Sequence, residues 1–305
     1  MSIPPAASSP APAAPTSSAL PSDSQAAEHP DDFLHRYLPA VRKRAFRLGL
    51  AANYGIDDAG VRHAFERGVN YVFWPIRERS MIPALRDALR RDREKMIIAA
   101  IPSTGFLGFT LRRAAEKALR ELQTDYLDIF QMGWLGRASA WTDGTVGELV
   151  RLREEGKVRA IGVSIHDRPR AGKLAADSPL DMLMIRYNAA HPGAERDIFP
   201  HLGERKPGNG RHPAAIIAYT ATSWGGLLKR PSGYEGRVPT AGDCYRFCLS
   251  SPHVDVVLTG PSSQQQLDEN LAAVAQGALS ADDMQWIREF GRVVHSKNVM
   301  PFSPR

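Results

Sequence analysis

The residues best suited to acid and base chemistry stand in short polar stretches that follow apolar runs. His166 follows the run 158–164 and is itself followed by Asp167. Because an imidazole has an ordinary pKa of about 6.5, His166 could exchange a proton near neutral pH. A plain pairing with Asp167 is the alternative, and we favour it. Tyr54, after the run 45–50, is a second candidate proton donor, with ordinary loop packing as its alternative.

A charged cluster follows the run 70–74, where Arg77, Glu78 and Arg79 stand in succession. Its guanidinium groups could receive an acidic substrate, because arginine forms strong, directional pairs with carboxylates. Mutual ion pairing in a solvated loop is the alternative. We favour the second interpretation, since exposed ion pairs contribute little to binding or stability.

Tryptophan is placed unevenly along the chain. Three of the five tryptophans, Trp74, Trp134 and Trp224, fall at the end of an apolar run or within five residues after it. Large aromatic rings supply contact area at low entropic cost, so these side chains predict an aromatic binding pocket. The alternative is that they fill a site that is no longer used, and the sequence leaves both interpretations open.

Length and composition predict an ordinary globular protein. The chain has 305 residues, of which 43% are hydrophobic and 24% charged, and this suits one large domain plus a tail. No apolar run approaches the roughly 18 residues that a membrane helix needs, and no secretory signal pattern opens the chain. We therefore expect a cytoplasmic protein. Cys244 and Cys248 have no nearby partner ligands, which favours two buried thiols over a disulfide and predicts no metal site.

Charge is distributed unevenly. Residues 1–35 contain four acidic and no basic residues, so residues 36–305 carry 39 basic against 33 − 4 = 29 acidic residues, a net +10. No recognised nucleic-acid-binding module accompanies this charge, so nucleic acid is not an expected partner. We expect a small-molecule ligand, no membrane contact, and a monomer or weak oligomer.

The order of apolar runs predicts the architecture. Residues 1–35 are rich in Pro, Ala and Ser and predict a disordered tail. Within residues 36–305, eight apolar runs read as strands: 45–50, 70–74, 96–101, 126–132, 158–164, 181–186, 214–219 and 255–259. Amphipathic segments alternate with them, with Asp57 and Ser280 as candidate helix caps and Gly68 and Gly156 after helix ends. The pattern predicts an α/β fold, a (β/α)8 TIM barrel with its site at the C-terminal ends of the strands.

Four longer stretches carry a family resemblance. They are AFERGVNY at 64–71, TDYLDIFQMGW at 124–134, EEGKVRAIGVS at 154–164 and LTGPSSQQQLDENL at 258–271. In this order, across about residues 44–294, they resemble the aldo/keto reductase superfamily. The resemblance implies a barrel that binds a nicotinamide dinucleotide and reduces carbonyl groups.

The catalytic positions of that superfamily are occupied by other residue types. The resemblance implies an aspartate, a tyrosine, a lysine and a histidine, and the matching positions here hold Phe73, a site near Glu78, Ile101 and Gly133. No tyrosine occurs between Tyr71 and Tyr126 that could supply the proton. Because carbonyl reduction needs a proton donor beside the oxygen, we expect the usual activity to be absent.

The cofactor positions match in part. The resemblance implies that Ser164 bonds the nicotinamide carboxamide and that Tyr219 stacks on the ring. Ile165 and Met184 replace the amide side chains that usually assist. It also implies a phosphate and adenine segment, formed by Gly260, Ser262, Gln266 and Asn270. Serines stand at 262 and 263 where NADP-selective relatives carry Lys or Arg, so NAD(P) binding is expected with NADH not disfavoured.

The leading hypothesis is an aldo/keto reductase-like protein with a degenerate active site, which keeps a dinucleotide or small-molecule pocket but not the usual carbonyl reduction. The first alternative is a working NAD(P)-dependent oxidoreductase that uses replacement groups from His166, Tyr54 or the 77–79 loop. The second is a barrel enzyme with non-redox chemistry.

Overall fold

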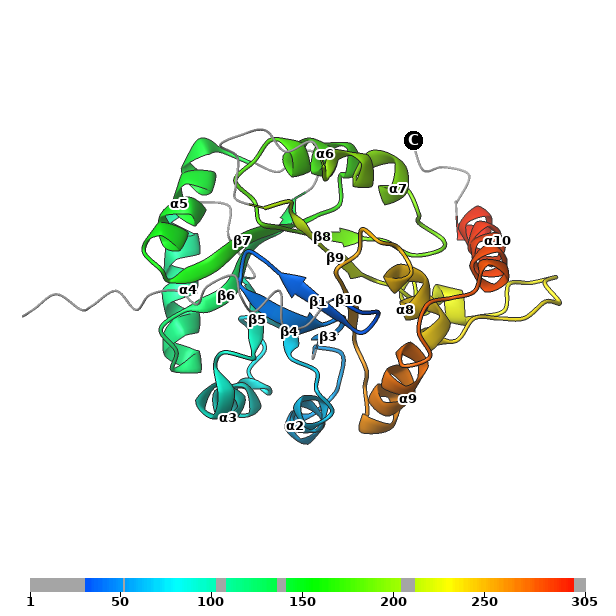
Figure 1. The fold of residues 1–305 in the computed structure, drawn as a ribbon, viewed down its shortest axis with the longest axis horizontal. Helices are drawn as coiled ribbons and strands as arrows, with labels where there is room; N and C mark the ends of the chain where they lie inside the picture. The colour runs from blue at the N-terminus through cyan, green and yellow to red at the C-terminus, as the bar shows by residue number, and fades with distance from the viewer. Residues whose placement is uncertain (1–30, 52, 103–107, 136–140, 204–211, 299–305) are drawn as a thin grey trace, which may run out of the picture. The chain divides into compact units, whose positions relative to one another are not determined.

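Eight parallel strands form a closed barrel at the centre of the computed structural model (Figure 1). The structure describes residues 31–51, 53–102, 108–135, 141–203 and 212–298. Around the barrel the strands follow the order β10-β3-β4-β5-β6-β7-β8-β9. They are β3 (Leu48–Ala51), β4 (Tyr71–Pro75), β5 (Ile97–Ile101), β6 (Leu127–Leu135), β7 (Val158–Ile165), β8 (Met182–Arg186), β9 (Ala215–Tyr219) and β10 (Val256–Thr259). Each overlaps an expected run, so the (β/α)8 fold is confirmed.

Helices surround the barrel (Figure 1). They are α2 (Asp58–Glu66), α3 (Ile82–Asp92), α4 (Gly108–Leu122), α5 (Asp143–Glu154), α6 (Arg168–Ala176), α7 (Ala194–Asp197), η1 (Phe199–His201), η2 (Gly226–Leu228), α8 (Ala241–Leu249), α9 (Gln264–Val274) and α10 (Ala281–Asn298). Both expected caps are present: Asp57 accepts from the backbone N–H of Gly60, and Ser280 accepts from that of Asp283. Gly68 takes the positive φ of 91° expected after a helix end.

The core has two layers because side chains of a strand alternate between the inside and the outside of the barrel. On β4, Tyr71 and Phe73 point inward, whereas Val72 and Trp74 pack between the strand and the helices. Cys248 on α8 is fully buried as a free thiol in the outer layer, and Cys244 is also buried and free, as expected.

A hairpin that the sequence did not predict lies across the N-terminal end of the barrel (Figure 1). It pairs β1 (His35–Leu38) with β2 (Lys43–Phe46). The expected strand 45–50 is therefore two strands, divided at Arg47, whose buried guanidinium bonds the carbonyls of Leu249 and Val254. Residues 31–35, which the sequence places in the tail, are among the described residues, and there the Asp32 carboxylate accepts the backbone N–H of Leu34. The remainder of the expected tail lies outside the described residues.

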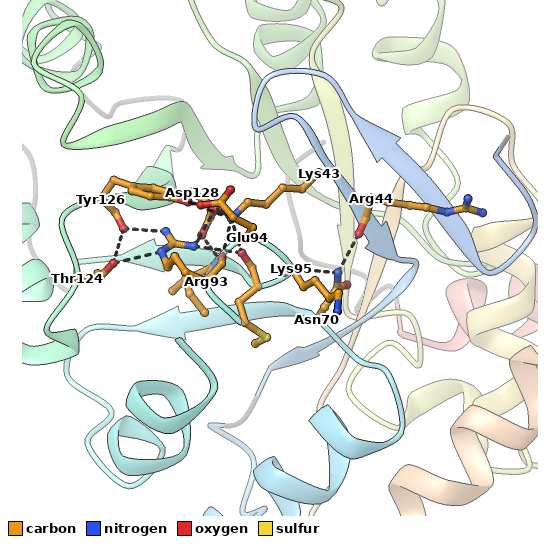
Figure 2. Close-up of polar contacts among 11 residues, drawn as sticks. Lys43, Arg44, Asn70, Arg93, Glu94, Lys95, Thr124, Tyr126 and Asp128 are labelled. Carbon is orange, nitrogen blue, oxygen red and sulfur yellow. Dashed lines mark hydrogen bonds and ion pairs between the residues drawn. The ribbon is translucent and has the colours of Figure 1, made fainter. Parts of the chain in front are cut away.

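A polar network fixes the hairpin to the barrel (Figure 2). The Lys43 ammonium donates to the Asp128 carboxylate at 2.8 Å and to the carbonyls of Arg93 and Met96, both at 2.9 Å. Arg93 pairs with the same carboxylate at 3.0 Å. Burial lowers the pKa of Lys43, and Asp128 opposes that effect. These buried charges close the N-terminal end, so the site must be sought at the other end.

Candidate functional site

A cavity of about 490 Å³ opens at the C-terminal ends of the strands, and we call it the mouth cavity. It brings together eight residues that the sequence singled out: Tyr54, Phe73, Trp134, Ser164, His166, Tyr219, Trp224 and Gly260. Arg77 from the charged cluster also lines it, as do Asn53, Met184 and Tyr245. These side chains come from segments that are distant in the sequence, and parallel closure of the barrel explains why they meet.

Trp74 was expected in the pocket, and the structure contradicts this. Its side chain is fully buried in the outer core layer, and its indole N–H donates to the carbonyl of Glu78 at 2.8 Å. The reason is the alternation along β4: Phe73 points into the barrel, so its neighbour must point out. Trp134 and Trp224 do line the cavity, with 46% and 62% of their surfaces exposed.

Three positions that the resemblance aligned with catalytic residues do not line the mouth cavity. Ile101 ends β5 and is fully buried, and Gly133 lies close to it near the end of β6, as expected for these strand ends. A Cβ on Gly133 would stand 3.3 Å from the Ile101 side chain. The Glu78 carboxylate accepts from the Ser80 hydroxyl at 2.8 Å, and this bond lowers the pKa of Glu78.

Ser164 has an unusual environment for a hydroxyl. It lies near the end of β7, lines the mouth cavity, and is only 1% exposed. Within the described residues its Oγ has no hydrogen-bond partner. A buried hydroxyl without a partner costs about 1–3 kcal/mol, so this atom suits a ligand that can bond to it.

Gln131 also has buried polar atoms without a hydrogen-bond partner, and it was not predicted as a site residue from the sequence. Its side chain is fully buried on β6, next to Gly162 of β7, and both its amide oxygen and its amide nitrogen lack protein partners among the described residues. Gln131 stands on the inward face of the barrel, because its neighbours Phe130 and Met132 pack in the outer layer. The available signal was a polar residue within a mostly apolar strand, which contains Asp128 as its other polar residue.

His166 pairs with Tyr219 rather than with Asp167. The Tyr219 hydroxyl and His166 Nδ1 are hydrogen-bonded at 3.0 Å, and the two rings meet edge to face. The expected partner, Asp167, instead caps α6 by accepting from the backbone N–H of Arg170. Burial lowers the pKa of His166, and the charge of Arg186 adds to the effect. Burial raises the pKa of Tyr219 to about 12, so both groups are neutral near pH 7.

Arg186 lies beside this pair. It ends β8 directly opposite Tyr219 in the strand register. In the described parts of the chain its guanidinium makes neither a hydrogen bond nor an ion pair, and burial lowers its pKa. No role for Arg186 was predicted from the sequence.

Of the four residues expected to hold the cofactor phosphate and adenine, only Gly260 lines the mouth cavity. Ser262 donates through its backbone N–H and its hydroxyl to the Gln266 side chain, at 2.9 and 3.0 Å. The Asn270 amide donates to the Thr259 hydroxyl at 3.1 Å and is buried. The side chains of three of the four residues therefore bond to residues within the stretch 258–271. The Tyr54 ring lies so close to Gly260 that a Cβ there would collide with it.

The backbone at the cavity rim is strained. Trp134, Thr220 and Trp224 all line the cavity and adopt positive φ angles of 50°, 56° and 53°. Such conformations cost non-glycine residues of order 1 kcal/mol each, and they gather at ligand sites. The rim therefore holds two exposed indoles in positions that the chain would not adopt by default.

The described residues contain no group of three or more His, Cys, Asp or Glu that could hold a metal ion. None of the described helices has the length and apolar character needed to span a membrane.

Comparison with known proteins gives a consistent result. Residues 84–236, half of the chain, match the model described as the aldo/keto reductase family. The aldo-keto reductase YhdN of Bacillus subtilis is 31% identical over 91 residues, so the chain spans 27% of its length and matches with 30% of its own. The holo form of aldo-keto reductase AKR11C1 from Bacillus halodurans has a TM-score of 0.69 at 22% identity, over 84% of this chain and 95% of that chain. An aldo/keto reductase from Klebsiella pneumoniae in complex with NADP and acetate has a TM-score of 0.66 at 21% identity, over 82% and 93%.

Proposed function

We propose, from the premise that this chain belongs to the aldo/keto reductase family, that its mouth cavity binds a nicotinamide dinucleotide and that it does not reduce carbonyls by the family's mechanism. Cofactor binding and proton donation are treated separately, because this chain has residues that match the family's nicotinamide positions but not its catalytic ones.

The observation that carries the binding half is the Ser164 hydroxyl. It is buried, has no protein partner in the described chain, and lines a cavity that also contains the Tyr219 ring. A carboxamide placed against Tyr219 would give this hydroxyl a hydrogen bond, which removes the penalty of an unpaired buried group. The NADP complex of the Klebsiella relative supports a dinucleotide as the ligand class.

The fit is better at the nicotinamide end than at the adenine end. Ser164 and Tyr219 would hold the nicotinamide, which supplies a hydride when it is bound. Ser262 and Gln266 would have to exchange their mutual bonds for bonds to phosphate. Neither Ser262 nor Ser263 supplies a positive charge for a 2′-phosphate, so we expect NADH to bind at least as well as NADPH.

The loss of the usual reduction follows from the lining of the cavity. The described lining contains no lysine and no carboxylate, and Phe73 stands where the resemblance implies the aspartate. An apolar ring cannot donate a proton to a developing alkoxide, and positioned proton transfer typically contributes about 10²–10⁴-fold to a rate. Glu78 would not substitute, since its lowered pKa keeps it a carboxylate that repels negative charge.

One observation favours a second candidate, a working oxidoreductase with a replacement proton donor. The 3.0 Å hydrogen bond between Tyr219 and His166 joins two titratable groups inside the mouth cavity. In that case the Tyr219 hydroxyl would give its proton to the substrate and recover one through His166. The raised pKa of Tyr219 leaves the hydroxyl protonated but makes it a weak acid.

A titration distinguishes the two candidates. Purified protein is titrated with NADH and with NADPH while tryptophan fluorescence is followed, because Trp134 and Trp224 line the same cavity as Tyr219. The saturated protein is then mixed with aromatic aldehydes, quinones and sugars. Saturable binding without cofactor oxidation supports the proposal, and oxidation that is lost in His166→Ala supports the second candidate. Absence of any saturable binding would overturn both.

A further inference from the structure

Arg77 is a positive charge without a bonded partner at the mouth cavity. It follows β4, lines the cavity, and is exposed. Within the described chain its guanidinium forms neither a hydrogen bond nor an ion pair, and Glu78 attracts it only at longer range. Many arginines in the described chain, by contrast, have a carboxylate within bonding distance, as Arg62 has in Asp58 and Asp87.

The neighbours of Arg77 are occupied elsewhere. The Glu78 carboxylate accepts from the backbone N–H and the hydroxyl of Ser80, at 3.1 and 2.8 Å. Arg79 pairs with Glu121 at 3.6 Å, away from the cavity. The mutual ion pairing expected from the sequence is therefore absent, and Arg77 alone of the three faces the cavity.

The described lining of the cavity has no negative charge to balance Arg77. It contains no aspartate and no glutamate, whereas His166 stands across the barrel with the unpaired Arg186 next to it on β8. Aromatic rings form much of the wall, including Phe73, Trp134 and Trp224. A concave site with one sign of charge and flat apolar walls favours a planar molecule of the opposite charge.

We propose that the part of the mouth cavity beside Arg77 binds an organic anion, a molecule with a carboxylate and a planar apolar body, whose carboxylate pairs with Arg77 while its body lies among Phe73, Trp134 and Trp224. This inference names the ligand class for the site proposed above and so rests on that site being a ligand site. It does not need the dinucleotide to be bound.

The position of Arg77 argues against its serving the cofactor phosphates instead. Gly260 and Ser262 follow β10, and a Cβ on Gly55, which follows β3, would lie 3.5 Å from Ser262. The segment expected to bind phosphate thus adjoins the loop after β3, whereas Arg77 follows β4 on the far side of β3. Arg77 can therefore serve an anion other than the cofactor phosphates, within the cavity that Ser164 and Tyr219 also line.

The test compares two probes of the same shape. 2-Naphthoate carries a carboxylate and 2-naphthamide is its neutral counterpart, and both are titrated by calorimetry into the full chain with and without NADH. We expect the naphthoate to bind about tenfold more tightly, as a charge-assisted hydrogen bond to arginine would give. In Arg77→Met the ratio should fall to about one, and in Arg77→Lys, which keeps the charge but not the planar fork, it should fall only in part.

Arg79→Met is the matched control, because it removes an equal charge from the same loop without touching the cavity, and it should leave the ratio unchanged. Equal binding of the two probes, failure of both to bind, or a ratio that survives in Arg77→Met would each overturn the inference. NADH affinity is measured on the same variants. An unchanged value in Arg77→Met is expected, and a tenfold loss would assign Arg77 to the cofactor instead. Failure of NADH binding alone would count against the proposed function but not against the anion site.

Discussion

Replacing Ser164 by alanine should stabilise the free protein or leave it unchanged, while weakening its binding of NADH. The Ser164 hydroxyl is buried at 1% exposure and has no protein partner among the described residues. A buried group of this kind costs about 1–3 kcal/mol, and water that reaches the cavity reduces that figure. We therefore expect the free energy of unfolding to rise by between zero and about 2 kcal/mol in Ser164→Ala.

The same substitution removes one hydrogen bond to the carboxamide. A net hydrogen bond contributes about 1 kcal/mol, so the Kd for NADH should rise about fivefold. Urea unfolding measures the free energy of unfolding, and calorimetric titration measures the Kd for NADH. In thermal unfolding, 1 kcal/mol corresponds to about 2–4 °C for a domain of this size.

Ser178→Ala is the matched control for the stability measurement. Ser178 is also buried, but its hydroxyl donates to the carbonyl of Leu174 and accepts from the backbone N–H of Leu180. Its loss should destabilise the protein by about 1 kcal/mol and leave NADH binding unchanged. If Ser164→Ala destabilised the free protein as Ser178→Ala does, the hydroxyl would have a structural partner and the reasoning would be wrong.

The remaining predictions concern stability, pH and cofactor choice. Lys43→Met should lower the free energy of unfolding by about 3 kcal/mol in urea titrations, because the negative charge of the buried Asp128 loses one of its cationic partners. Lys95→Met, which removes an exposed ion pair with Asp92, should change the free energy of unfolding by under about 0.5 kcal/mol. Burial, aided by Arg186, lowers the pKa of His191 to about 4, so unfolded His191 takes up a proton below its ordinary pKa of 6.5 while the folded one does not. The free energy of unfolding should therefore fall as the pH drops from 6.5 toward 4, because only the unfolded His191 is protonated there. In His191→Gln the free energy of unfolding should fall less steeply over that pH range, and an equally steep fall would contradict the prediction. NADH should bind at least as tightly as NADPH in parallel titrations, and a tenfold preference for NADPH, about 1.4 kcal/mol, would contradict the assignment of Ser262 and Ser263.

The barrel could be predicted from the sequence because its eight strands are short apolar runs separated by helical patterns. The β1–β2 hairpin could not, because its stability comes from contacts with distant segments. Lys43 bonds Asp128, 85 positions away, and Arg47 bonds the carbonyl of Leu249. Polar residues such as these are buried by contacts with distant segments, and from the sequence alone they resemble the exposed polar residues of a loop.

The location of the candidate site and several of its residues were predicted from the sequence, but the hydrogen bonds between its side chains were not. Parallel strands bring their C-terminal ends together, so Ser164, Tyr219 and Trp224 could be expected at one mouth. Successive side chains of a strand point to opposite faces. Trp74 was therefore wrongly expected in the pocket, because its neighbour Phe73 is the one that points into the barrel. His166 was paired with its sequence neighbour Asp167, whereas closure of the barrel supplied Tyr219, 53 positions away.

The central claim, that the chain binds a nicotinamide dinucleotide but does not reduce carbonyls by the family's mechanism, is tested most directly by a single rapid-mixing measurement. Protein saturated with NADH is mixed with a panel of carbonyl compounds, and tryptophan fluorescence and the absorbance of reduced nicotinamide are recorded together. We expect the fluorescence to report bound NADH throughout while the absorbance decays no faster than in protein-free buffer. Rapid decay of the absorbance in the wild-type chain would contradict the claim.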